Sequence, residues 1–119
     1  MSAGRPESLS AVTIGVTDMG ASCAFYGALG FEVVHGGPDA AFTSCAVGPG
    51  FLNLQLVERT EVRWGRFIVH VDDVDAMHER ALAAGLTPSM PPSDAPWGER
   101  YFHIDDPDGH EVSFARPLR

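Results

Sequence analysis

The segment RFIVHVDDVDAMHERALAAGL, at residues 66–86, repeats a pattern that first appears at residues 11–31 as AVTIGVTDMGASCAFYGALGF. At an offset of 55 residues, Asp18 aligns with Asp73, and a glycine closes each copy. Each copy reads as an alternating strand, an aspartate, a helical pattern and the glycine. Repetition at a fixed offset predicts one supersecondary unit that the chain uses twice.

The chemistry of each copy supports this prediction. Asp18 and Asp73 are good helix N-caps, because a carboxylate accepts hydrogen bonds from the first free N–H groups of a helix. Gly30 and Gly85 suit the left-handed conformation that often follows a helix. Strand-like runs then follow each helix, with turns rich in glycine and proline between them. The runs are FEVVHG, AAFTSCAVG and FLNLQLVE in the first half, and LTPSM, RYFHID and HEVSFA in the second.

These patterns predict an α+β fold made of two βαβββ modules. We expect the modules at about residues 9–58 and 65–116, within a single domain that follows a flexible tail at residues 1–8. A chain of 119 residues is long enough for one domain with a real core. The segment PPSDAP, at residues 91–96, is expected to be an irregular loop because proline cannot donate a backbone hydrogen bond.

Composition argues against several classes of function. A net charge of −8 and a pI of about 4.8 argue against nucleic-acid binding, which needs clustered lysine and arginine. No apolar run is long enough to span a membrane, and the first residues do not form a signal peptide, so we expect a cytoplasmic protein. Cys23 and Cys45 are expected to be buried apolar residues that form neither a disulfide nor a metal pair.

Strand parity places two kinds of side chain on opposite faces of the predicted sheets. One face is consistently apolar, as in Val12, Ile14 and Val16, and should pack on the helices. The other face mixes polar, aromatic and small residues, which is typical of a surface that holds a ligand. We expect the ligand-binding residues on this mixed face and in two flanking tryptophans. They are Thr13, Asn53, Gln55, Trp64, Arg66, Ile68, His70, Trp97, Tyr101, His103, Glu111 and Ser113.

Three stretches, VTDMGASCAFYGALGF, HVDDVDAMHERALAAG and PWGERYFHIDDPDGHEVSF, together resemble the vicinal oxygen chelate superfamily. That group includes glyoxalases, extradiol dioxygenases, fosfomycin-resistance enzymes and bleomycin-resistance binding proteins. The resemblance covers about residues 9–116. It implies mixed sheets that curl around a cleft, often completed by a second chain in a homodimer. It also implies four metal-ligand positions, which fall here on Ala11, Gln55, Arg66 and Ser113.

Those four side chains are not a ligand set for a divalent ion. Alanine has no donor atom, glutamine and serine are neutral, and the Arg66 guanidinium carries a fixed positive charge and no acceptor. Catalytic zinc takes about three His, Cys or carboxylate ligands, and non-haem iron takes two His and one carboxylate. We therefore expect no metal and no cofactor. A displaced metal site formed by His70, His103 and Glu111 is the alternative.

The favoured hypothesis is a metal-independent binding protein of the bleomycin-resistance type, and not an enzyme. It would sequester an aromatic natural product or antibiotic and act as a homodimer. Tryptophan and tyrosine rings could stack on a planar heterocycle or attract a cation. Arg66 could pair with a ligand carboxylate or phenolate, or with Glu58 or Glu111. In the competing interpretation, Trp97 only anchors the proline-rich loop.

Two further hypotheses stay open. The first is an enzyme, either a lyase, isomerase or dioxygenase with the displaced metal site, or a metal-free enzyme with His70 or His103 as general base. The second is an accessory or regulatory module whose dimer surface matters more than its cleft.

Other polar residues are expected to have structural roles only. Asp106 and Asp108 lie on either side of a proline and precede a glycine, which is the composition of a tight turn. His35, His78 and His110 are expected to be exposed, at a strand end, on a helix face and in the turn, respectively.

Overall fold

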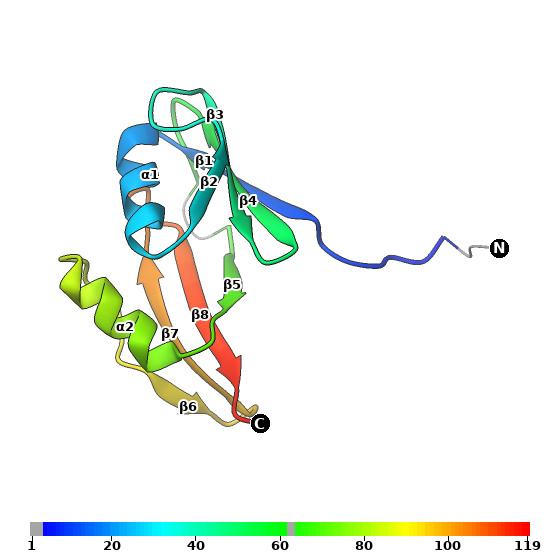
Figure 1. The fold of residues 1–119 in the computed structure, drawn as a ribbon, viewed down its shortest axis with the longest axis vertical. Helices are drawn as coiled ribbons and strands as arrows, with labels where there is room; N and C mark the ends of the chain where they lie inside the picture. Colours follow the sequence, from blue (N-terminus) through cyan, green and yellow to red (C-terminus); the bar gives the residue numbers. More distant parts are fainter. Residues whose placement is uncertain (1–3, 62–63) are drawn as a thin grey trace.

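The computed structural model describes residues 4–61 and 64–119, which fold as two modules with the same order of elements (Figure 1). The first module contains β1 (Ala11–Val16), α1 (Met19–Ala28), β2 (Glu32–His35), β3 (Phe42–Val47) and β4 (Gly50–Leu56). The second contains β5 (Arg66–His70), α2 (Val74–Ala83), β6 (Ser93–Ala95), β7 (Glu99–Asp105) and β8 (Glu111–Pro117). The predicted α+β fold of paired βαβββ modules is confirmed.

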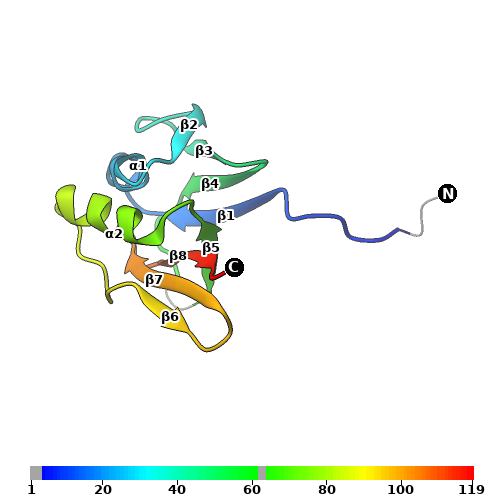
Figure 2. The same ribbon diagram turned by 60° about the horizontal axis from the view of Figure 1, so that its bottom comes forward.

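Each module forms its own four-stranded mixed sheet. The first sheet has the order β1-β4-β3-β2, and the second has the equivalent order β5-β8-β7-β6. In each sheet the strand before the helix pairs in parallel with the last strand of the module, and the remaining pairs are antiparallel. The strands before the two helices, β1 and β5, are therefore edge strands. Figure 2 shows α1 and α2 on the same side of the molecule.

Both helices are capped by the predicted aspartates, which directly precede their first residues. The side chain of Asp18 accepts a hydrogen bond from the backbone N–H of Ala21 at 3.0 Å, and Asp73 accepts one from Ala76 at 2.9 Å. These bonds pair donors that the first turn of a helix leaves free. After the helices, the backbone at Gly30 and Gly85 turns through the left-handed region, with φ of 92° and 80°.

One apolar core joins the two modules. The predicted apolar faces are buried, as Ile14 and Val16 show for the first sheet and Phe102 and Phe114 for the second. Tyr26 of α1 is completely buried among them. Its ring contacts Phe25 and Phe31, and Phe31 in turn contacts Phe114 of the other module. Cys45 is buried and Cys23 half-buried, and both are free thiols.

One strand prediction is wrong. LTPSM does not form a strand, and β6 lies instead at Ser93–Ala95, inside the segment expected to be an irregular loop. Pro88 interrupts LTPSM and cannot donate to a ladder. The three residues of β6 lie between prolines and pair antiparallel with the start of β7 at Glu99–Tyr101. A short edge strand of this kind needs few backbone donors, so flanking prolines are compatible with it.

No helix among the described residues is long and apolar enough to cross a membrane, since α1 and α2 have ten residues each.

Candidate functional site

A hollow of about 320 Å³ lies on the exposed face of the second sheet. Strand parity explains its composition, because the side chains that alternate with buried Phe102 and Phe114 must point to the opposite face. The register places Ser113 of β8 between Ile68 of β5 and His103 of β7. We call this the second-sheet hollow; its lining residues are Arg66, Ile68, Trp97, Glu99, Tyr101, His103 and Ser113. All except Glu99 were predicted from the sequence as ligand-binding residues.

Three aromatic rings follow β7 along one side of this hollow. The ring centroids of Trp97 and Tyr101 are 5.7 Å apart, and those of Tyr101 and His103 are 5.1 Å apart. Trp97 is 67% exposed, and its Nε1–H donates to Glu99 at 2.9 Å. This bond satisfies the only polar atom of the indole and leaves a large ring surface open to solvent. An open aromatic surface beside further rings suits a planar ligand.

One ion pair and one contact between a histidine and a glutamate border the hollow. Arg66 Nη1 lies 2.7 Å from Glu111 Oε2. Glu111 was one of the partners considered for this arginine, beside Glu58 and a ligand oxygen. Arg66 and Glu111 are register partners on β5 and β8 and are 49% and 37% exposed, so the pair should contribute less than about 1 kcal/mol of stability. Nε2 of His70 lies 3.7 Å from Oε2 of Glu99. The guanidinium keeps several N–H groups beyond the one that Glu111 accepts.

His103 lies between Tyr101 and Ser113 with no hydrogen bond to its ring among the described residues. Burial lowers the pKa of its imidazole, and the neighbouring Arg66 lowers it further, while Glu111 and Asp105 act in the opposite direction. Its Nδ1 is shielded from solvent and has no partner. The charged form of the ring is therefore disfavoured, and Nε2 is the nitrogen that remains for a ligand.

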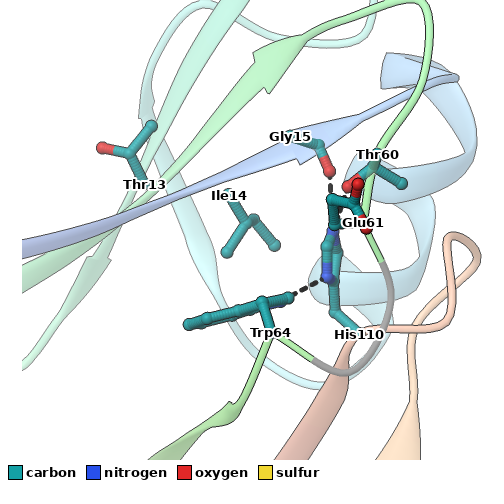
Figure 3. A pocket seen from close by; sticks show the side chains of 7 residues that line it. All are labelled: Thr13, Ile14, Gly15, Thr60, Glu61, Trp64 and His110. Carbon is teal, nitrogen blue, oxygen red and sulfur yellow. Dashed lines mark hydrogen bonds between the residues drawn. The ribbon is translucent and has the colours of Figure 1, made fainter.

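Trp64 and Thr13 belong to a different place in the molecule. They line a second hollow of about 170 Å³ beside the free edge of β1, here called the Trp64 hollow (Figure 3). Trp64 Nε1 donates to His110 Nδ1 at 2.7 Å, and His110 Nε2 lies 2.7 Å from the carbonyl oxygen of Gly15. Because an indole nitrogen can only donate, Nδ1 of His110 must accept and Nε2 must carry the proton. Thr60 Oγ1 is 3.2 Å from the same Nε2.

The predicted exposure of two histidines is wrong. His110 is only 2% exposed, because its ring lies between Trp64, which donates to Nδ1, and the carbonyl oxygen of Gly15 in β1, which lies beside Nε2. His78 is half-buried, with its ring 5.1 Å from that of Phe102. His35 is exposed as predicted.

The Asp106–Asp108 segment forms the expected turn but also has a second role. Oδ1 of Asp106 accepts from the backbone N–H groups of Asp108 and His110, each at 2.9 Å. Its Oδ2 accepts from the hydroxyl of Tyr26 in the other module at 2.7 Å. Asp108 accepts from the backbone N–H and the hydroxyl of Thr17. Sequence reasoning missed this contact between modules, although a tyrosine on the apolar stripe of α1 was a signal for it.

The four positions that the resemblance assigned to metal ligands do not gather in one site. Arg66 and Ser113 line the second-sheet hollow, whereas Ala11 lines an apolar groove with Phe51, and Gln55 lines neither. Across residues 4–61 and 64–119, no three His, Cys, Asp or Glu side chains are placed to hold a metal ion.

The displaced set of His70, His103 and Glu111 is not brought together either. Glu111 is held by Arg66, and His70 lies beside Glu99. The residues present therefore do not fit the metal of the family. Asn53, another predicted ligand-binding residue, hydrogen-bonds to Ser44 and Thr13 and lines neither named hollow.

The profile of the Glyoxalase/Bleomycin resistance protein/Dioxygenase superfamily matches residues 8–114. The chain belongs to this superfamily. Among solved structures, a bleomycin resistance determinant encoded on the transposon Tn5 superposes with a TM-score of 0.79 at 19% identity, covering 95% of this chain and all of that one. A bleomycin-binding protein complexed with bleomycin gives 0.76 at 20% identity, covering 93% and 98%.

Lactoylglutathione lyase from Agrobacterium tumefaciens is equally similar, with a TM-score of 0.77 at 23% identity and coverage of 93% and 94%. These likenesses show the fold, and both binding proteins and a lyase share it. An uncharacterized protein of Mycobacterium tuberculosis is 47% identical over 49 residues, which is 41% of this chain and 29% of that protein. A protein of Mycobacterium bovis matches over the same length, at 32% of its own. The match thus spans about a third of these curated relatives.

Proposed function

We propose that this protein binds a small aromatic molecule without transforming it, and that the second-sheet hollow is the binding surface. The observation that carries the proposal is the row of rings from Trp97 through Tyr101 to His103, open on one side of a hollow of about 320 Å³. Pockets for small organic ligands have this combination of aromatic walls and a few polar groups. A protein of this kind would sequester a natural product or antibiotic, as the bleomycin-binding relative binds bleomycin.

Metal independence is part of the proposal. It is supported by the chemistry of the four family positions, where an alanine, an amide, a guanidinium and a hydroxyl offer no set of anionic or imidazole ligands. Arg66 in particular would repel a divalent ion at its own position. Elemental analysis of protein purified without chelator tests this part, and a near-stoichiometric transition metal would contradict it.

A homodimer is the third part of the proposal. An apolar groove of about 180 Å³ runs between the two sheets, and the side chains of Phe51 and Ile68 along it are 45% and 56% exposed. Burying such rings and methyl groups against a second copy is favourable, at about 25 cal/mol for each Å². Sedimentation velocity should show a dimer that Phe51→Glu converts to monomer. A monomeric wild-type protein at all concentrations would contradict this part.

Fluorescence of two matched single-tryptophan variants tests the binding site. Trp64→Phe leaves only Trp97, in the second-sheet hollow, and Trp97→Phe leaves only Trp64, in the other hollow. We expect planar aromatic compounds, bleomycin among them, to quench Trp97 saturably and to leave Trp64 unchanged. Saturable quenching of Trp64 alone would move the site to the other hollow. No saturable quenching in either variant across the panel would contradict ligand binding.

The similarity to a lyase keeps an enzyme as the second candidate. His103 is the residue that favours it, since an imidazole that lines a hollow can exchange a proton with a bound compound as a general acid or base. In that case, turnover of a bound compound would be lost in His103→Phe while binding persisted. Unchanged compound after prolonged incubation, recovered by chromatography, supports the binding protein.

A further inference from the structure

Arg66 is the side chain with a fixed positive charge among the residues that line the second-sheet hollow. Glu99 is the one acidic side chain among its lining residues, and it already accepts from Trp97 and lies near His70. Glu111, on the border, accepts from Arg66. Arg66 keeps unused N–H groups and has no acceptor at all. A ligand that enters this hollow therefore meets a guanidinium with unused N–H groups and a carboxylate that is already in contact with Trp97 and His70.

His103 adds a donor, as its surroundings determine which nitrogen carries the proton. Nδ1 is shielded from solvent and has no partner. A proton placed there would bury an N–H group without an acceptor, at a cost of about 1–3 kcal/mol, whereas a proton on the other nitrogen can be paired by a ligand or by water. This favours the neutral tautomer with its proton on Nε2, the ring nitrogen that is not shielded and unpaired. The hydroxyl of Ser113, in register with His103, lines the same floor.

We propose that Arg66 and His103 select ligands whose aromatic ring carries an anionic oxygen, a carboxylate or a phenolate. This inference rests on the proposed function and names the chemistry of its ligand. The ring of the ligand lies along Trp97 and Tyr101, while its oxygen accepts from Nε2–H of His103 and from the guanidinium. Charge-assisted bonds of this kind are about twice as strong as neutral ones. The protein has a net charge of −8, which alone would favour cationic ligands. A preference for anions would therefore have to come from groups in the hollow.

Three probes with one ring system test the selection. They are 2-naphthoate, 2-naphthylmethanol and 2-naphthylmethylamine, which at neutral pH are an anion, a neutral molecule and a cation. Affinity is measured by quenching of Trp97 in the Trp64→Phe protein. We expect 2-naphthoate to bind at least about tenfold more tightly than the amine, since a hydrogen bond to a charged group contributes about 1.5–3 kcal/mol.

Two variants locate the selecting groups. His103→Phe keeps a ring beside Tyr101 but removes the N–H, and Arg66→Met keeps an apolar stem but removes the charge. Each should weaken 2-naphthoate by about tenfold and leave 2-naphthylmethanol within about twofold, as expected when one charge-assisted bond is lost. Glu111→Gln is the matched control on the same charge pair. By releasing Arg66, it should strengthen 2-naphthoate or leave it unchanged.

The outcomes separate this inference from the proposed function. If the three probes bind with equal affinity, or the amine binds best, ligand binding stands and the selection is wrong. If 2-naphthoate is preferred but His103→Phe keeps the full preference, the assignment of selection to His103 is wrong. If no probe quenches Trp97 saturably, both fail for this class of ring.

Discussion

The two modules meet at two equivalent hairpin turns, and the two turns have opposite chemistry. In the second module the turn between β7 and β8, residues 106–110, makes hydrogen bonds to Gly15 and Thr17 at the end of β1 and to Tyr26 in α1. In the first module the turn between β3 and β4 is only Gly48 and Pro49. Beside it lies an apolar hollow of about 210 Å³, whose lining includes Val71 and Met77 of the second module. We call the first contact the polar joint and the second the apolar joint.

This difference shows that two modules with the same fold can contact each other through different interactions at equivalent turns. The polar joint uses directional bonds from Asp106, Asp108 and His110, which fix the position of one module on the other. The apolar joint has a turn without long side chains, so contact there depends on burial alone, which is not directional. Orientation should therefore come from the polar joint, and the apolar joint should adapt to it.

Removal of Asp106 should have the largest effect. Asp106→Ala leaves the Tyr26 hydroxyl and the N–H groups of Asp108 and His110 without their acceptor in a buried setting. We expect a loss of about 3 kcal/mol in the free energy of unfolding, measured by urea titration. Asp106→Asn, which keeps an oxygen acceptor of the same shape, should lose clearly less. Equal losses in the two variants would show that hydrogen bonding is not the basis of the joint.

Met77→Ala at the apolar joint should have the next largest effect. Met77 is half-buried against the core and lines the hollow, so its truncation enlarges a space that is already present. We expect a loss of about 1–2 kcal/mol, about half of the usual cost for a fully buried methionine. Met77→Leu, which nearly conserves volume, should be close to wild type. If Met77→Ala lowers the free energy of unfolding as much as Asp106→Ala does, the polar joint does not contribute more to stability than the apolar joint.

Trp64→Phe tests whether the hydrogen bond from Trp64 to His110 belongs to the polar joint. The change removes the indole N–H that His110 accepts and leaves Nδ1 of the buried ring unpaired. We expect a loss of about 1 kcal/mol by thermal or urea unfolding. Trp97→Phe is the matched control, because Trp97 donates to Glu99 at an exposed site and its loss should lie within about 0.5 kcal/mol. If the control is the more damaging variant, Trp64 is not part of the joint.

The sequence predicted those parts of the molecule that depend on local chemistry. Asp18 and Asp73 act through bonds to residues three positions away, and Ile14 and Val16 act through the alternation of a strand. Most of the second-sheet hollow was predictable for the same reason, because alternation along β5, β7 and β8 places its residues on one face.

The polar joint was not predictable, because its partners are distant in sequence. Asp106 and Tyr26 are separated by 80 residues, and Gly15 and His110 by 95. Pattern reasoning therefore assigned Asp106 to turn chemistry alone and His110 to the surface. For the same reason Trp64 was grouped with Trp97, although they line different hollows. Which module edge lies beside which turn is a property of the assembled fold.

The contrast between two histidines gives the last and smallest prediction. His110 has a partner for each nitrogen, whereas none of the described residues makes a hydrogen bond to the ring of His103. Burial lowers the pKa of His103 despite the nearby Glu111 and Asp105. The unfolded chain then binds a proton at a higher pH than the folded one, so stability falls as the pH drops below the ordinary histidine value of about 6.5.

Replacing His103 by phenylalanine removes this dependence while keeping a ring beside Tyr101. Between pH 7.5 and 5.5, urea titrations should therefore show wild type losing slightly more stability than His103→Phe. The Hε1 resonance of His103, followed by NMR, should titrate at lower pH than a histidine in a short peptide. A higher midpoint would mean that Glu111 and Asp105 outweigh burial and Arg66. The ring would then enter the hollow as a cation, and His103 would be a charged donor in place of the neutral one inferred from its shielded Nδ1.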